Sequence, residues 1–154
     1  MAQPDQGKKH IIEGSQINII NTPIRCMQIN LQHSRTATDN LMKLVEKEKT
    51  DIIFIQEPYL NKHKMTGITR SFRSYLSPAD NSRAAIVITN KEIDAVLITQ
   101  ISNSDIVLLE IAYKKTKAFI ASAYFDITTN IEDELNRLDQ ILELTKKTRN
   151  SNSG

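Results

Sequence analysis

The spacing of hydrophobic positions changes several times along the chain. Residues 24–31 alternate between two faces, which predicts a strand. Residues 36–49 carry apolar side chains on one helical face, which predicts a helix of about three to four turns. The apolar run within residues 51–56 is typical of a strand buried on both faces. A strand, a helix and a strand in succession form a right-handed unit with parallel strands, so the two strands end at the same edge of a sheet.

The remainder of the chain predicts antiparallel strands and a second helix. Residues 61–71 are polar and basic and contain Gly67, which is typical of an exposed loop. Short connections separate the following apolar runs and favour hairpins. The strands are predicted at residues 72–76, 83–89, 94–101, 105–113 and 117–125, and the helix at residues 130–148. We therefore expect an α/β fold with a mixed sheet and both helices on its outer face.

Composition narrows the class of protein without identifying it. The 154 residues are 40% hydrophobic and 25% charged, which is ordinary for one globular domain. Residues 1–23 are polar and are expected to form a leader that is at most partly ordered. The single cysteine, Cys26, excludes an intrachain disulfide and a multi-cysteine zinc site. The low cysteine content favours an intracellular protein. With no apolar span near 20 residues, we expect it to be soluble and to have no membrane partner.

Polar side chains at strand ends are the candidate functional residues. Glu57 directly follows the buried strand, Asn30 lies near the end of the first strand, and Tyr124 lies near the end of the last. Loops leaving that edge of an α/β sheet can converge on a substrate. Each residue also has a structural interpretation: Glu57 as an acid bonded to a loop, Asn30 as a tie to a loop, and Tyr124 as a rim aromatic. We expect His33 to be solvated or bonded to the backbone, and Asp126 to cap a turn.

Basic residues in and after the loop offer a nucleic-acid contact. A phosphate-binding patch is one interpretation of this group, and a solvated loop is the other. A net charge of +2 permits a polyanionic partner without requiring one. The candidate DNA-binding residues are Lys62, Lys64, Arg70 and Arg73.

Three motifs in a fixed order carry a family resemblance. They are "QINLQHS" at residues 28–34, "DIIFIQEPYL" at 51–60 and "ASAYFD" at 121–126. Taken together in this order, the motifs resemble those of the endonuclease/exonuclease/phosphatase family, specifically of the apurinic-endonuclease-like domain of non-LTR retrotransposons. The resemblance spans roughly residues 24–149 and implies the N-terminal half of a four-layer α/β sandwich of the DNase I-like type, with residues 24–154 as a partial domain.

The resemblance also implies roles for three residues. Glu57 resembles the family's Mg²⁺-binding glutamate, Asn30 the asparagine that arranges the metal and the scissile phosphate, and Tyr124 the tyrosine that contacts that phosphate. The family's proline two residues after this tyrosine is replaced here by Asp126. The later Gly-Asp-x-Asn and Ser-Asp-His segments are absent, so we expect an incomplete one-metal site and a fragment that is inactive alone. A sheet face left uncovered by the missing half should be exposed and apolar.

The function implied by the resemblance is Mg²⁺-dependent nicking of target DNA, which frees a 3′ hydroxyl to prime reverse transcription. It further implies a nuclear location and a reverse transcriptase domain on the same chain of the parent protein. Two alternatives remain. One is another phosphoesterase of the family, and the other is a non-catalytic truncated copy with residual DNA binding.

Overall fold

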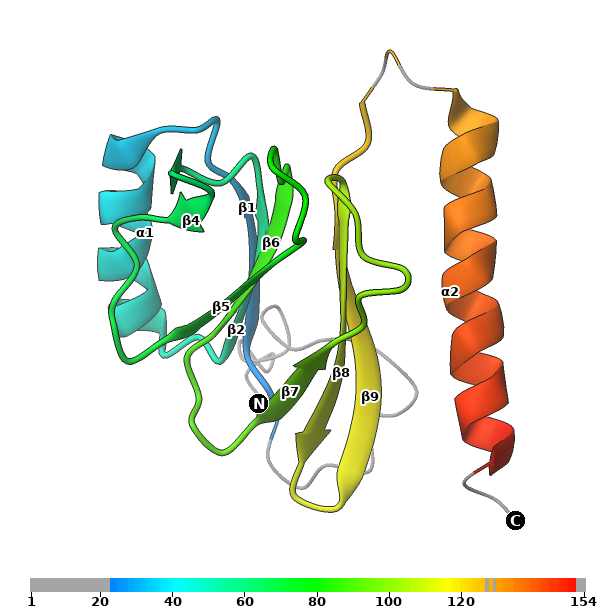
Figure 1. Cartoon of the computed structure of the whole chain (residues 1–154). Coiled ribbons are helices and arrows are strands. Elements are labelled where there is room, and N and C mark those ends of the chain that lie inside the picture. The colour runs from blue at the N-terminus through cyan, green and yellow to red at the C-terminus, as the bar shows by residue number, and fades with distance from the viewer. Residues whose placement is uncertain (1–22, 127, 129, 152–154) are drawn as a thin grey trace, which may run out of the picture.

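Two β-sheets lie face to face between two helices (Figure 1). The computed structural model describes residues 23–126, 128 and 130–151. Apart from Pro23, the expected leader lies outside these residues. The layers follow the order helix α1, a four-stranded sheet, a three-stranded sheet and helix α2. The prediction of an α/β sandwich is therefore confirmed.

The four-stranded sheet contains the predicted parallel unit. Its strand order is β1-β2-β6-β5, with β1 parallel to β2 and the other pairs antiparallel. Asn30 pairs with Gln56, so Asn30 and Glu57 end at the same edge, as predicted. The elements are β1 (Cys26–Asn30), α1 (Arg35–Glu48), β2 (Ile52–Gln56), β5 (Arg73–Leu76) and β6 (Ala84–Ile88).

Helix α1 covers one face of this sheet. The Ser34 hydroxyl accepts the Ala37 N–H at 3.2 Å and caps the amino end, while Lys49 ends the helix in the left-handed conformation. Leu41 of the helix packs with Ile53 and Ile55 of β2 in one buried cluster. Alternation along β2 sends its remaining apolar side chains to the opposite face.

The single mixed sheet predicted from the sequence is wrong, because the later strands form a sheet of their own. Strand β6 already pairs with β2 on one side and β5 on the other, so the strand that follows it cannot pair with β6 itself. It crosses over at buried Ile93 instead. The three-stranded sheet consists of β7 (Asp94–Leu97), β8 (Ile106–Tyr113) and β9 (Thr116–Ala123) in antiparallel order. Strand β7 ends before residue 101 because Ser102 N–H turns back to the Ile98 carbonyl at 3.0 Å.

The two sheets bury each other's inner faces. Ile52 and Ile86 of the first sheet share a fully buried cluster with Val107 and Leu109 of the second. The apolar sheet face expected to be exposed is thus covered from within the chain, because both sheets are present. A buried polar contact lies within this interface: the Ser122 hydroxyl donates to the Ile55 carbonyl at 3.1 Å.

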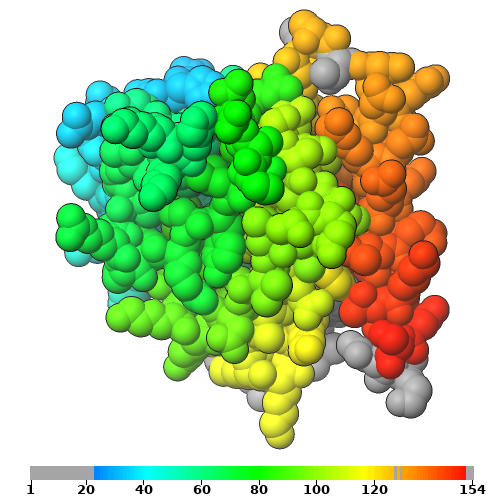
Figure 2. Space-filling view, in the orientation of Figure 1, coloured from blue at the N-terminus to red at the C-terminus, as the bar shows by residue number. Residues whose placement is uncertain are grey.

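Helix α2 (Ile131–Ser151) lies along the three-stranded sheet, so the two helices do not share the outer face of one sheet (Figure 2). Three apolar residues spaced along one side of this helix, Ile131, Leu135 and Leu142, are exposed. Arg137 turns toward the sheet instead and lies 3.9 Å from Asp105. No helix within the described ranges is long and apolar enough to cross a membrane.

The expected loop at residues 61–71 begins with a small hairpin. Strands β3 (Leu60–Asn61) and β4 (Lys64–Met65) pair around Lys62 and His63, which both have positive φ angles of 48° and 64°. Two such residues between paired strands form a type I′ turn. The usual Asn-Gly signal of this turn is absent, which is why the pattern predicts only a loop.

Candidate active site

Glu57 stands at the carboxyl end of β2 in a left-handed conformation. Its φ is 48°, a region that costs a non-glycine residue about 1–2 kcal/mol. Two backbone hydrogen bonds hold it there: Glu57 N–H donates to the Arg83 carbonyl at 2.8 Å, and the Glu57 carbonyl accepts His33 N–H at 2.9 Å. Regular alternation would place this side chain on the α1 face with Ile53 and Ile55. The left-handed turn removes it from that pattern, and its side chain is 22% exposed at the sheet edge.

The loop between β1 and α1 lies against this turn. Asn30 Oδ1 accepts Gln32 N–H at 2.8 Å, so the side chain does tie the loop to the sheet. His33 Nδ1 lies 3.1 Å from the Pro58 carbonyl, which makes that nitrogen the proton donor. His33 Nε2 lies 4.0 Å from Glu57 Oε1. The structure therefore bonds His33 to the backbone, as predicted, and also places it beside the candidate carboxylate.

Tyr124 reaches the same edge from the second sheet. It directly follows β9, and its N–H donates to the Asp105 carbonyl at 2.8 Å. Burial raises the pKa of the Tyr124 hydroxyl, and so do the negative charge and hydrogen bonding of the Glu57 carboxylate. Asn30, Glu57 and Tyr124, the three residues singled out in the sequence, thus lie at one edge of the sandwich.

Arg83 and Asp105 complete this edge, and the sequence pattern did not identify them. Arg83 Nε and Nη2 donate to the two oxygens of Asp105 at 2.7 and 2.9 Å, and Nη1 donates to Asp126 Oδ2 at 2.7 Å. Both carboxylates raise the pKa of Arg83. An arginine directly before the apolar run of residues 84–88 was a possible signal, because β6 starts where the antiparallel β2 ends.

Asp126 caps a turn, as predicted. Its Oδ1 accepts the Thr128 N–H at 2.9 Å and the Thr128 hydroxyl at 2.7 Å. These bonds, together with the Arg83 guanidinium, lower the pKa of Asp126 to about 2. Asp126 therefore has partners that account for its position without a metal ion.

One carboxylate at this edge could contribute to an open magnesium site. Mg²⁺ often binds only one or two protein carboxylates and keeps several waters. Glu57 supplies one such carboxylate, while the Asn30 amide oxygen is already bonded to Gln32. Within the part of the chain that the structure describes, no group of three or more His, Cys, Asp or Glu could hold a metal ion. The site suits a cation that water and a substrate phosphate would also ligate.

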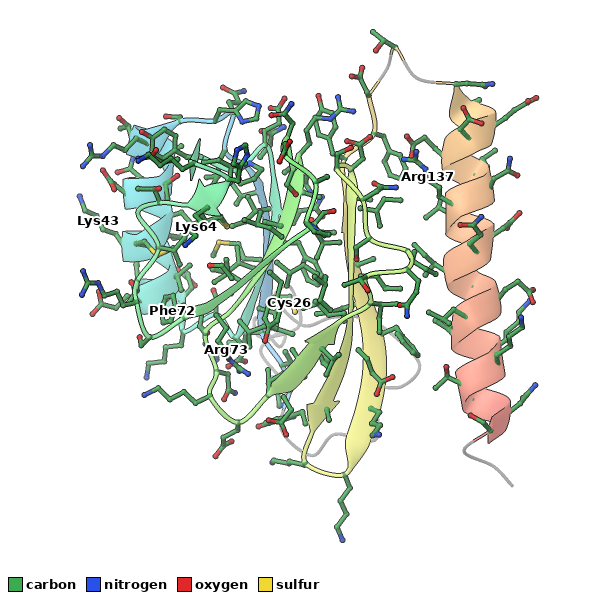
Figure 3. All side chains as sticks on the ribbon, viewed as in Figure 1. Cys26, Lys43, Lys64, Phe72, Arg73 and Arg137 are labelled. Atoms are coloured by element: carbon green, nitrogen blue, oxygen red, sulfur yellow. The ribbon has the colours of Figure 1, made fainter. Side chains whose placement is uncertain are left out.

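The four basic candidates do not lie together. Lys62 and Lys64 are exposed on the β3-β4 hairpin, which begins three residues after Glu57, and Arg70 is exposed further along the same loop. Arg73 lies at the other end of the four-stranded sheet, opposite Ile88, and donates to the Asn90 and Ile93 carbonyls. Figure 3 shows Lys64 and Arg73 at different levels of the molecule. The structure thus separates Arg73 from the candidate site.

A groove lies away from these residues. Residues of the second half of α1 and of the loop before β5 line this open groove, among them Lys43 and Phe72 (Figure 3). Thr89, which follows β6 at the strand end remote from Glu57, also lines it. This groove contains none of the candidate catalytic residues.

Comparison with solved structures finds a retrotransposon nuclease. The endonuclease domain of TRAS1, a telomere-specific non-LTR retrotransposon, superposes with a TM-score of 0.70 and 28% sequence identity, covering 80% of this chain and 54% of that domain. An endonuclease/exonuclease/phosphatase family protein from Leptotrichia buccalis C-1013-b matches at 16% identity, covering 76% of this chain and 60% of that one, with a TM-score of 0.47. No family model and no curated protein matches the sequence. The chain spans about half the length of the TRAS1 domain, and the predicted resemblance to this nuclease family is confirmed.

Proposed function

Because the chain has the fold of the endonuclease/exonuclease/phosphatase family, we propose that it forms part of a Mg²⁺-dependent DNA endonuclease that nicks the target of a retrotransposon. The observation that carries this proposal is that Glu57 and Tyr124, which follow strands of two different sheets, both contact Arg83. The Arg83 carbonyl accepts the Glu57 N–H at 2.8 Å, and Arg83 Cζ lies 4.8 Å from the centroid of the Tyr124 ring. The likeness to the TRAS1 domain supports it. In the proposed setting the nick primes reverse transcription in the nucleus, by a reverse transcriptase domain of the parent protein.

The residues at this edge have distinct proposed roles. Glu57 would hold Mg²⁺, which offsets negative charge on the phosphoryl oxygens of the DNA backbone. The Tyr124 hydroxyl donates to a phosphate oxygen, and Asn30 keeps the β1-α1 loop beside the metal through its bond to Gln32. Lys62, Lys64 and Arg70 would bind the phosphates that flank the cut. Arg73 is left out of this proposal because its guanidinium is bonded to backbone carbonyls at the other end of the sheet.

A second candidate is a non-catalytic domain that only binds DNA. It is favoured by the single candidate metal carboxylate, since the described residues hold no three-ligand group. The two candidates differ in one measurable property: an endonuclease binds a divalent cation at Glu57, whereas a DNA-binding domain needs none.

The test combines nicking of supercoiled plasmid with NMR detection of Mn²⁺, a paramagnetic substitute for Mg²⁺. Proteins compared are the chain, Glu57→Gln, and the matched control Glu46→Gln on the exposed face of α1. We expect Mn²⁺ to broaden the amide signals around Glu57 in the chain and the control, and not in Glu57→Gln. If nicking is detected, it should occur with the chain and with Glu46→Gln and be lost in Glu57→Gln.

The outcomes separate the candidates. Mn²⁺ binding at Glu57 with DNA binding but no nicking supports an endonuclease whose remaining catalytic groups lie outside these 154 residues. DNA binding without any Mn²⁺ effect at Glu57 supports the non-catalytic domain. Nicking that survives Glu57→Gln contradicts the proposed role of Glu57.

A further inference from the structure

Arg83 lies where the two sheets and the candidate site meet. It precedes β6, whose Ala84 pairs with Gln56, so Arg83 stands beside Glu57. Its carbonyl accepts the Glu57 N–H at 2.8 Å, and its N–H donates to the Ser104 carbonyl, just before β8. The backbone of this one residue therefore joins the end of β2 to the second sheet.

The Arg83 side chain is held rigidly by two carboxylates. Asp105 accepts two of its N–H groups and Asp126 accepts a third, at distances between 2.7 and 2.9 Å. The Asp105 side chain is only 8% exposed and that of Arg83 30% exposed. A planar guanidinium bound in this forked manner has little freedom to reorient.

Tyr124 rests on this ion pair in two ways. Its N–H donates to the Asp105 carbonyl, and its ring centroid lies 4.8 Å from Arg83 Cζ, within the range of a cation–π contact. The ring is thereby held beside the residue whose carbonyl accepts the Glu57 N–H.

Direct phosphate binding by Arg83 is the competing explanation, and the local charge disfavours it. One guanidinium faces two carboxylates, which leaves this cluster net negative. Arg137 adds one positive charge, with its Nη1 3.9 Å from Asp105 Oδ2. The same Nη1 also lies 3.9 Å from Glu134 Oε1, which adds a further negative charge. Because three of its five N–H groups are already bonded, Arg83 has little capacity left for a phosphate.

We propose that Arg83 is a positioning residue, whose guanidinium, clamped by Asp105 and Asp126, fixes the Tyr124 ring opposite Glu57. This inference rests on the proposed function, since it assigns Arg83 to the same metal-binding edge. It places Arg83 behind the reacting groups and not in contact with the substrate.

The test measures the distance from Tyr124 to a cation at Glu57, without requiring activity. In the chain, Mn²⁺ should broaden both the Glu57 amide signal and the Tyr124 ring signals, which are assigned with Tyr124→Phe. In Arg83→Lys and Arg83→Ala, the Glu57 broadening should persist while the Tyr124 broadening falls at least severalfold. Arg73→Lys, whose guanidinium is bonded at the opposite strand end, should change neither signal.

Two failures can be told apart. No Mn²⁺ effect at Glu57 in the unaltered chain overturns the proposed function, and the positioning role falls with it. Normal Glu57 broadening with unchanged Tyr124 broadening in both Arg83 variants overturns the positioning role alone.

Where nicking is measurable, kinetics give a second readout. Arg83→Lys should lower kcat by up to about 100-fold with little change in KM, as expected for a misplaced group. In a Tyr124→Phe background the same change should have almost no further effect. A raised KM that adds fully to the effect of Tyr124→Phe would instead identify Arg83 as a phosphate ligand and overturn the proposal.

Discussion

The two ends of the four-stranded sheet contain similar residue types that make different contacts. At the end remote from Glu57, Asp51 accepts the Arg25 N–H at 2.8 Å and the Asn90 amide at 3.1 Å, and Arg73 donates to backbone carbonyls. These polar groups close loops. At the Glu57 end, the carboxylate of Glu57 accepts no backbone hydrogen bond among the described residues, and its neighbours are side chains. The two ends therefore differ in whether their carboxylates are used up in backbone hydrogen bonds, and not in how many polar residues they contain.

Backbone conformation separates the two ends as well. Gln32, His33 and Glu57 have positive φ angles at the candidate site, where the loops leave β1 and β2. At the remote end, Lys49 adopts this conformation, where it has the ordinary role of ending α1. Gln32 and His33 form a tight turn that the Ser34 N–H closes on the Leu31 carbonyl, whereas neither a helix end nor a hairpin requires the positive φ of Glu57.

The largest expected difference concerns ion pairing. Asp105→Ala leaves the partly buried Arg83 without its forked partner, and we expect it to lower the free energy of unfolding by about 3 kcal/mol. Asp51→Ala at the remote end removes hydrogen bonds from a half-buried site and should cost about 1.5 kcal/mol. Urea denaturation of both variants measures this. Equal losses would mean that the two ends are stabilised alike.

A glycine at each end tests the cost of the left-handed backbone. Glu57→Gly and Lys49→Gly should each raise the free energy of unfolding by about 1 kcal/mol, because glycine adopts positive φ without a steric penalty. Only Glu57→Gly should abolish Mn²⁺ binding. Destabilisation by Glu57→Gly would show that its side-chain contacts outweigh the strain.

The basic residues give a smaller effect, measured on DNA. Replacing both Lys62 and Lys64 by alanine should reduce the slope of log affinity against log salt by about 0.9 for each phosphate that the lysines neutralise. Arg73→Lys should leave the slope unchanged, since Arg73 lies at the other end of the sheet. Identical slopes for all proteins would place the DNA elsewhere.

The smallest effect is a dependence of stability on pH. The pKa of Asp126 is lowered in the folded protein to about 2, from an ordinary 3.8, so its stabilising contribution is complete well above pH 3.8 and is lost as pH falls toward 2. Asp126→Asn should therefore lose less stability than the unaltered chain as pH falls through this window. Parallel urea midpoints across the same range would show that Asp126 gains nothing from its partners.

The sequence predicted those parts of the site that depend on strand ends. Periodicity identified the parallel unit, and this was enough to bring Asn30 and Glu57 to one edge. The contact between Arg83 and Asp105 was beyond reach, because it joins two sheets across 22 residues and no local pattern fixes which strands face each other. The same limit explains why one mixed sheet was expected where the longer strands divide between two packed sheets.

Backbone conformation was also unpredictable from residue type. Lys62, His63 and Glu57 take a conformation that glycine or asparagine usually signals. Tertiary contacts select it at Glu57, since both of its backbone polar groups are bonded to residues distant in sequence. Local propensity carries no trace of such contacts.

The hydrogen bond from Ser122 to Ile55 has a mechanical consequence. Ile55 lies two residues before Glu57, and Ser122 lies two residues before Tyr124. The bond therefore links the two sheets at an equal chain distance from Glu57 and from Tyr124. Sliding one sheet over the other would break this buried bond before it could separate carboxylate from phenol. The bond therefore ties together the two strands that lead to Glu57 and Tyr124.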